Sequence, residues 1–298
     1  MRRLNTLVLC AASALLVLAT ATRASADPIL GPALASFSIL GAETVTNTGA
    51  TTLTGNLGVD PGSAISGKAT ITVNGTNAAT IGNPSVHESD AFAELAQSQL
   101  ASAMTNLGLL GAGTLLSVDL AGLTLTPGVY TVPAGISNLT GTLTLDGQGN
   151  ANAFWVFQMP STLITSPGSV VDVINTGAGA GLYWTVGSSA IIDTSTSFQG
   201  NILALTSISL NTGATIGCGR ALAHVGAVTM DANTVSIGCD SNGFSGSGLG
   251  FDSSGNLVDS GGNLLAPSAV PEPGTMVLLG TGIAWVVARR KKSRLAIP

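Results

Sequence analysis

Hydrophobic residues follow three different patterns along the chain. Near each end, an unbroken apolar run stands close to a cluster of basic residues, at 7–19 and at 276–288. Between these runs, short stretches of alternating apolar and polar residues are separated by Gly, Asn and Pro, which is typical of half-buried β-strands. Only residues 85–107 form a long stretch that contains neither Gly nor Pro and favours helix. We therefore expect a mainly β protein with a single long helix.

The helix predicted over 85–107 is rich in Ala, Glu, Gln, Leu and Met, which favour helix formation. Its start resembles a capping box, with Ser85 as the N-cap and Glu88 three residues later. Gly108 ends it, because Gly is preferred just past a helix C-terminus. The side chains that fall near one side and predict the packed face are Phe92, Leu95, Leu100, Ala103 and Leu107.

A loose repeat runs through the C-terminal half of the β-rich part. The segments SAIIDTSTSF (189–198), SISLNTGATI (207–216) and AVTMDANTV (227–235) each combine an alternating strand, a polar Asp or Asn, and a corner of small residues. STLITSPGSV (161–170) fits the same frame less well. A period of 18–20 residues suits three short strands per coil, and stacked coils bury a continuous apolar interior. We therefore expect a β-solenoid.

The two ends of the chain predict export. Residues 1–26 have the form of a secretory signal peptide, with basic residues, an apolar run and a small-x-small site at 24–26. Sec-type export machinery and signal peptidase are the partners that such a segment implies. At the other end, Pro271, Glu272 and Pro273 precede the second apolar run, and Arg289 and Arg290 begin the basic cluster that should stay cytoplasmic.

The C-terminal residues 270–298 resemble the PEP-CTERM sorting signal of Gram-negative bacteria. This resemblance implies a transient inner-membrane anchor that an exosortase-type protease cuts near the Pro-Glu-Pro motif. The body would then reach the cell surface or the extracellular matrix. A permanent anchor with a short transmembrane segment is the alternative. Residues 240–269 are rich in Gly, Ser, Asn and Asp, and we expect them to be a flexible spacer.

The body between the two ends is acidic. Within residues 27–270, only Lys68 and Arg220 are basic, against 14 of the 15 acidic residues, which gives a net charge near −12. Such a surface repels phosphate backbones, so no nucleic-acid partner is expected. Because Lys and Glu are scarce, Thr, Ser, Asn, Ala and Gly must cover most of the exterior.

Two cysteines remain in the body, Cys218 in TIGC (215–218) and Cys239 in SIGC (236–239). They are 21 residues apart, which is close to one coil, so they are expected on neighbouring coils. An exported protein can keep a disulfide there. A zinc site would need more ligands, and His87 and His224 have no matching spacing. We therefore predict a disulfide, with no metal and no cofactor.

Four stretches are similar to the ice-binding-protein-like family of bacteria, fungi and algae. They are VTNTGATTLTGNLGVDPG (45–62), TLTPGVYT (124–131), LTGTLTLDGQGNANAFWVFQ (139–158) and FQGNILALTSISLNTGATIGCGRALA (198–223). The resemblance implies an all-β domain over 27–239, folded as a discontinuous right-handed β-helix of triangular cross-section with one long α-helix alongside. It also implies that the N-terminal strands return to complete the solenoid beside the last coils.

Family members that bind ice do so through a flat solenoid face of short side chains. The positions that match this face here are Thr194 with Ser197, Thr212 with Thr215, Ala232 with Thr234, and, as an extension, Ser166 and Ser169. Stacked Thr side chains are restricted about χ1, so they lose little entropy when they bind. The alternative is that Thr and Ser simply suit exposed strands.

The predicted function is that of an exported, non-enzymatic antifreeze-like protein that binds the ice crystal surface and restrains recrystallisation. An adhesin that binds extracellular polysaccharide through the same face is the alternative. Trp155, Tyr183 and Trp184 are expected in the core, not as sugar-stacking platforms, because they recur beside apolar neighbours. An enzyme is not expected, since the acidic residues are isolated along the chain.

Overall fold

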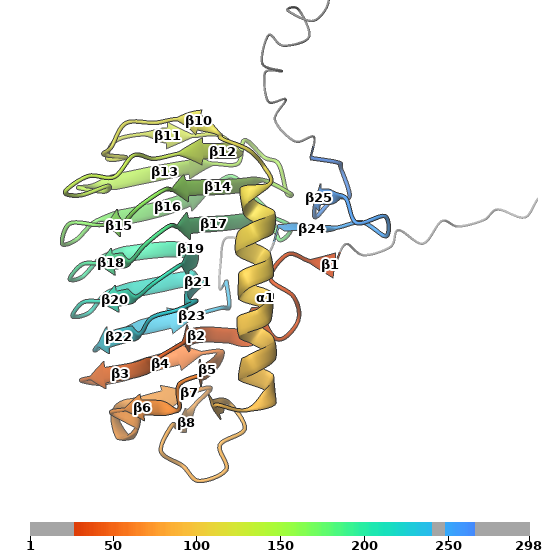
Figure 1. Ribbon diagram of the computed structural model, residues 1–298. Helices are drawn as coiled ribbons and strands as arrows, with labels where there is room; N and C mark the ends of the chain where they lie inside the picture. Colours follow the sequence, from red (N-terminus) through yellow and green to blue (C-terminus); the bar gives the residue numbers. More distant parts are fainter. Residues whose placement is uncertain (1–26, 240–247, 266–298) are drawn as a thin grey trace, which may run out of the picture.

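The computed structural model of the protein describes residues 27–239 and 248–265 (Figure 1). Short strands form a stack of coils, and one helix, α1 (Ala91–Gly108), runs along the stack. Each coil contributes strands to three faces, which we call A, C and B in the order in which the chain visits them. The predicted fold class, a β-solenoid with one long helix beside it, is confirmed.

Face A lies beneath α1. Its strands, in stacking order, are β10 (Thr114–Leu115), β12 (Gly128–Thr131), β14 (Phe154–Met159), β17 (Gly181–Val186), the second halves of β19 (Ser197–Ala204) and β21 (Thr215–Ala223), β2 (Phe37–Gly41), β5 (Asn56–Val59) and β9 (Val86–Glu88). All of these neighbours pair in parallel. Their outward side chains Val156, Tyr183, Leu203 and Leu222 share an apolar cluster with the helix.

Faces C and B complete each coil. Face C consists of β15 (Leu163–Ile164), β18 (Ala190–Ile192), β20 (Ile208–Leu210), β22 (Val228–Asp231), β3 (Thr44–Thr48) and β6 (Ala64–Ser66). Face B consists of β11 (Thr124–Leu125), β13 (Thr142–Asp146), β16 (Val170–Ile174), the first halves of β19 and β21, β23 (Thr234–Ser236), β4 (Thr51–Thr54) and β7 (Ile71–Val73). At one end of face B, β8 (Thr76–Asn77) pairs antiparallel with β7.

The spacing between paired residues explains why the repeat is only partly visible in the sequence. Ser197, Thr215 and Thr234 are paired in register at separations of 18 and 19 residues, as predicted. The earlier coils are longer, since Val170 pairs with Ser197 and Phe154 pairs with Gly181. Their extra residues lie in the connections between faces, so the strands stack in register although the period changes.

The stacking order differs from the chain order. Strand β2 lies between β21 and β5, while β22 pairs with β3 and β23 pairs with β4. The last coils in the sequence therefore rest on the first, and α1 carries the chain from one end of the stack to the other (Figure 1). This confirms the expectation that the N-terminal strands complete the solenoid beside the last coils.

The interior is a column of stacked apolar side chains. The rings of Tyr130, Phe157, Trp184 and Phe198 follow one another along it, with centroid separations of 5.6, 4.1 and 5.0 Å. The indole N–H of Trp184 donates to the Gln199 carbonyl at 3.0 Å, so its one polar atom is satisfied inside the core. The predicted core positions of Trp155, Tyr183 and Trp184 are confirmed, because all three are fully buried.

Helix α1 begins later than predicted, at Ala91 instead of Ser85. Residues 86–88 form β9 and pair with β5 of the solenoid, and these backbone hydrogen bonds prevail over the local capping-box signal. The N-cap is Asp90, whose carboxylate accepts the N–H groups of Phe92 and Ala93.

The packed side of the helix also differs from the predicted one. Leu100, Ala103 and Leu107 are buried as predicted, but Phe92 and Leu95 are 38% and 48% exposed. The other buried positions are small or polar, namely Ala93, Ala96 and Gln97. Gln97 donates to the carbonyls of Gly41 and Ala223, so the helix is held to face A by hydrogen bonds as well as by apolar contacts.

Residues 248–265 differ from the flexible spacer predicted over 240–269. Strands β24 (Leu249–Phe251) and β25 (Leu257–Asp259) form a hairpin, and β1 (Asp27–Pro28) pairs with β24. We call this three-stranded sheet the clasp. Leu249 is buried, and its N–H donates to the Tyr183 hydroxyl at 3.4 Å. The remaining residues of the predicted spacer, 240–247 and 266–269, lie outside the described residues.

Arg220 ties the N-terminal segment to the solenoid. Its guanidinium is buried and donates to the carbonyl of Ala35 at 3.1 and 2.6 Å and to the side-chain oxygen of Asn201 at 2.7 Å. Burial lowers the pKa of Arg220 to about 10, so the group remains charged at neutral pH. Lys68 instead forms a partly exposed ion pair with Glu88 at 2.9 Å.

Replacing Arg220 should be far more damaging than replacing Lys68. Arg220→Met leaves the Asn201 and Ala35 oxygens buried without this donor, which should lower the free energy of unfolding by about 3 kcal/mol. Lys68→Met removes a partly exposed ion pair and should cost less than about 1 kcal/mol. Urea unfolding of residues 27–265 measures both values. Equal losses for the two variants would contradict this account of Arg220.

Candidate functional site

One column of outward side chains runs straight along face B. It passes through successive coils in register, and its members are Thr142, Val170, Ser197, Thr215, Thr234, Thr52 and Thr72. The alternating residues of the same strands, such as Phe198, Ile216 and Val235, are buried in the core. The pleat therefore fixes the column on the outer surface. We call it the threonine column.

A second column lies two residues further along the same strands. It includes the in-register pairs Thr124 with Thr144, Gln199 with Gly217, and Ser236 with Thr54. Neighbouring coils are about 4.8 Å apart and outward positions about 6.7 Å apart along a strand, so the columns form a regular grid. The one charged member of the second column is Asp172, which pairs with Thr144.

Within the described residues, the hydroxyls of the threonine column form almost no hydrogen bonds with the protein, and only that of Thr215 donates to a protein group, the Thr196 carbonyl at 3.5 Å. Ser197, Thr234 and Thr52 are exposed, and within the described residues their hydroxyls form no hydrogen bond to another protein group. On face C, by contrast, Thr46 donates to Thr229 at 3.3 Å, so neighbouring hydroxyls bond to each other. Face C also carries two outward isoleucines, Ile164 and Ile191, in the same column of paired residues as Ser209. Face B is therefore the better candidate for a surface that orders water.

The predicted site residues divide into two groups. Ser197, Thr215 and Thr234 belong to the threonine column. Thr194 and Thr212 instead lie at the corner between faces C and B, where the Thr212 hydroxyl donates to the Asp231 carboxylate. The Asn211 amide donates to the Asp193 carboxylate at 2.8 Å, and the Thr194 N–H donates to the same carboxylate. These two hydrogen bonds hold the pKa of Asp193 below its ordinary value. An ionised carboxylate, that of Asp193, therefore lies at this edge of the grid.

Ala232 does not align with Thr194 and Thr212. At this corner each coil has one left-handed residue, and these are Gly168, Ser195, Gly213, Ala232 and Gly49, with φ of 71, 55, 72, 53 and 75°. The N–H of Gly213 donates to the backbone carbonyl of Asp231, and the N–H of Ser195 donates to the backbone carbonyl of Thr212. Asp231, not Ala232, is therefore the residue in line with Thr212. Ala232 therefore serves the turn of the coil.

The extension predicted at Ser166 and Ser169 is displaced from the grid. Ser169 is buried, and its hydroxyl donates at 2.7 Å to the carbonyls of both Leu139 and Ser166. The hydroxyl of Ser166 lies 3.0 Å from that of Ser137, at the corner. The coil contributes Val170 to the threonine column instead, because Val170 pairs with Ser197.

Sequence reasoning missed Thr142, Thr52 and Thr72 of the threonine column. Thr52 and Thr72 lie far from the visible repeat and reach the column only because the N-terminal coils stack on β23. The alternation T-x-T at 52–54 and 142–144 is the local signal that could have found Thr52 and Thr142, since it places both threonines of each pair on one side of a strand.

The predicted disulfide is confirmed. Cys218 and Cys239 are bonded, with their Cα atoms 4.7 Å apart, and they join the coil of β21 to the coil of β23. Neither sulfur is therefore a thiolate available to zinc. Among residues 27–239 and 248–265, no group of three or more His, Cys, Asp and Glu side chains is placed to hold a metal ion.

The predicted membrane segment at 276–288 lies outside the described residues, and so does the predicted signal peptide. The same holds for the sorting-tail residues Pro271, Glu272, Pro273, Arg289 and Arg290. In the part of the chain that the structure describes, no helix is long and apolar enough to cross a membrane.

This geometry defines a class of protein, the parallel β-helix with hydroxyl side chains in register along one face. Residues 39–236, more than half of the chain, match the Ice-binding-like family, and residues 269–292 match the PEP-CTERM protein-sorting motif. The chain therefore belongs to the ice-binding-like family and carries a PEP-CTERM sorting motif at its C-terminus, as predicted. That motif implies export to the cell surface or beyond it.

Known relatives agree with this assignment. An ice-binding protein of Nostoc sp. (strain HG1) is 45% identical over 278 residues, which cover 92% of this chain and 91% of the relative. The crystal structure of an ice binding protein from an Antarctic biological consortium has a TM-score of 0.62 and 39% identity, over 70% of this chain and 90% of that one. The ice-binding protein of the Antarctic ascomycete Antarctomyces psychrotrophicus has a TM-score of 0.61 and 31% identity, over 72% and 98%.

Proposed function

We propose that the mature body binds ice, without catalysis, through face B. The observation that carries this proposal is the threonine column, in which five Thr, one Ser and one Val lie in register on seven neighbouring strands. The relatives that are named ice-binding proteins support ice as the ligand. The contrast between the hydroxyls of faces B and C supports the choice of face.

The chemistry of this surface suits ordered water. Each Thr presents a methyl group beside a hydroxyl, and stacking on a rigid solenoid fixes both before any contact with ice. Little conformational entropy is therefore lost on binding. Long charged side chains would disturb such a lattice. The two basic side chains of the body contact other groups, since Lys68 pairs with Glu88 and Arg220 donates to Asn201.

The two ends of the chain indicate where the mature body acts. Signal peptidase would remove residues 1–26 after Sec-type export, and an exosortase-type protease would cut the tail near Pro271. The sorting motif over 269–292 supports the second step. The body would then act at the cell surface or in the extracellular matrix, where ice forms around the cell.

The direct test is an ice-activity assay on purified residues 27–265. We expect thermal hysteresis, faceted ice crystals and inhibited recrystallisation at micromolar protein. Bovine serum albumin at equal mass concentration is the control for non-specific effects. Unshaped ice and unhindered recrystallisation would reject ice binding and favour an adhesin that binds polysaccharide.

A matched pair of substitutions tests the choice of face. Thr234 and Thr229 are both exposed and belong to the same coil, but they lie on faces B and C. Thr234→Tyr places a protruding ring in the threonine column and should reduce thermal hysteresis to less than about half, because a flat contact depends on close fit. Thr229→Tyr should leave it nearly unchanged, and thermal denaturation should show that both variants fold. A larger loss from Thr229→Tyr would assign the activity to face C.

A further inference from the structure

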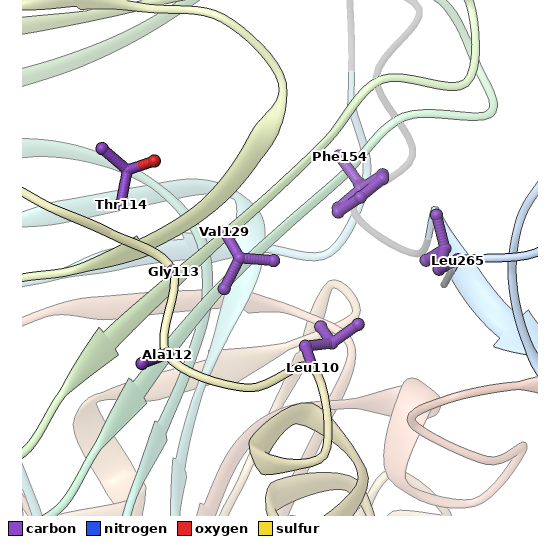
Figure 2. A pocket seen from close by; sticks show the side chains of 7 residues that line it. All are labelled: Leu110, Ala112, Gly113, Thr114, Val129, Phe154 and Leu265. Carbon is purple, nitrogen blue, oxygen red and sulfur yellow. The ribbon is translucent and has the colours of Figure 1, made fainter. Parts of the chain in front are cut away.

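A groove whose lining side chains are mostly apolar lies on face A where helix α1 ends. It encloses about 470 Å³ and is lined chiefly by Leu110, Ala112, Gly113, Val129, Phe154 and Leu265. Figure 2 shows the side chains of Leu110, Val129, Phe154 and Leu265 around the same space. No charged side chain lines it.

The groove is open because the connection after α1 has almost no side chains. Residues 111–113 are Gly-Ala-Gly. A Cβ on Gly113 would lie 2.1 Å from the Val129 carbonyl oxygen, so the close approach of this backbone to β12 requires glycine. The chain therefore passes over face A without filling the space between Leu110 and Phe154.

Leu265 forms the boundary between this groove and a second cavity. The second cavity, of about 370 Å³, lies on the clasp side of the helix end, and both Leu110 and Leu265 line it as well. The N–H of Leu265 donates to the Leu257 carbonyl at 3.0 Å, so β25 fixes its position. The hydrogen bond to β25 therefore holds the chain at the wall of the groove at Leu265.

The residues that follow Leu265 match the uncharged lining of the groove. Residues 266–270 are Ala-Pro-Ser-Ala-Val, which are small and uncharged, and Pro271-Glu272-Pro273 comes next. Pro267 disfavours helix at Ala266, so this segment favours an extended path. Five extended residues span about 17 Å. Because the segment continues directly from the groove wall, it is present there at a high effective concentration.

We propose that residues 266–270 of the same chain dock in this groove and so present the Pro-Glu-Pro motif at a fixed place beside the folded body. The sorting protease then meets its motif on the helix side of the molecule, and the threonine column on face B stays uncovered while the tail is still attached. This inference concerns sorting and does not depend on ice binding.

Cysteine cross-linking in the full chain tests the proposal. The chain is expressed in an export-competent Gram-negative host that lacks the sorting protease, and peptide mass spectrometry measures the linked fraction after mild oxidation. The test pair is Ala112→Cys with Ala269→Cys. The control pair is Ser102→Cys with Ala269→Cys, because Ser102 is exposed on α1 outside the groove. We expect roughly ten-fold more linkage within one chain for the test pair, as a held segment gives.

Equal linkage of the two pairs would overturn the proposal. Linkage mainly between two chains would overturn it in favour of a second copy in the groove. If the test pair prevents the native Cys218–Cys239 bond, Thr114→Cys replaces Ala112→Cys. Independently of cysteine, Ala112→Trp should fill the groove and raise hydrogen exchange at residues 266–270 about ten-fold, whereas unchanged exchange would contradict docking.

Discussion

The in-register stacking of parallel strands is the constraint on which the rest of this structure depends. Each coil hydrogen-bonds to the next at the common strand spacing, so an inward residue always meets another inward residue. The stack from Tyr130 to Phe198 inside and the threonine column outside are two results of this one register. A slip of one residue in any coil would bury a Thr and expose a core residue. Core packing therefore keeps the outward side chains aligned from coil to coil.

The break in chain order makes this constraint harder to satisfy and also explains the role of several buried polar groups. Coils from opposite ends of the sequence must meet at β21 and β2, and no covalent continuity holds them there. The Arg220 guanidinium donates a hydrogen bond across this junction to the Ala35 carbonyl. The Gln97 side chain of α1 donates to the carbonyls of Gly41 and Ala223, which lie on the two sides of the junction. The Cys218–Cys239 bond joins the last two coils before the junction. These contacts hold the two parts of the threonine column in one line.

Much of this architecture was predictable from the sequence, whereas long-range strand pairing and the direction of single side chains at the corners were not. The repeat predicted the register of Ser197, Thr215 and Thr234, because their strands are consecutive. Thr52 and Thr72 were missed because only long-range strand pairing brings them into the threonine column. Ser169 was predicted as part of the binding face but is buried, because a polar residue at a corner can also turn inward. The helix start at Ala91 depends on the pairing of β9 with β5, which outweighs the signal at Ser85. Gly, Ser and Asp in residues 248–265 suggested a spacer, although they form the turns of the clasp.

The most direct measurement of the central claim is magnetisation transfer from ice to methyl-labelled threonines in a frozen solution of residues 27–265. It reports which side chains touch ice without any substitution. The account predicts rapid transfer to the methyl groups of Thr52, Thr215 and Thr234 on face B, and slow transfer to those of Thr46 and Thr229 on face C. Faster transfer to Thr46 and Thr229, or no transfer to any threonine, would contradict it.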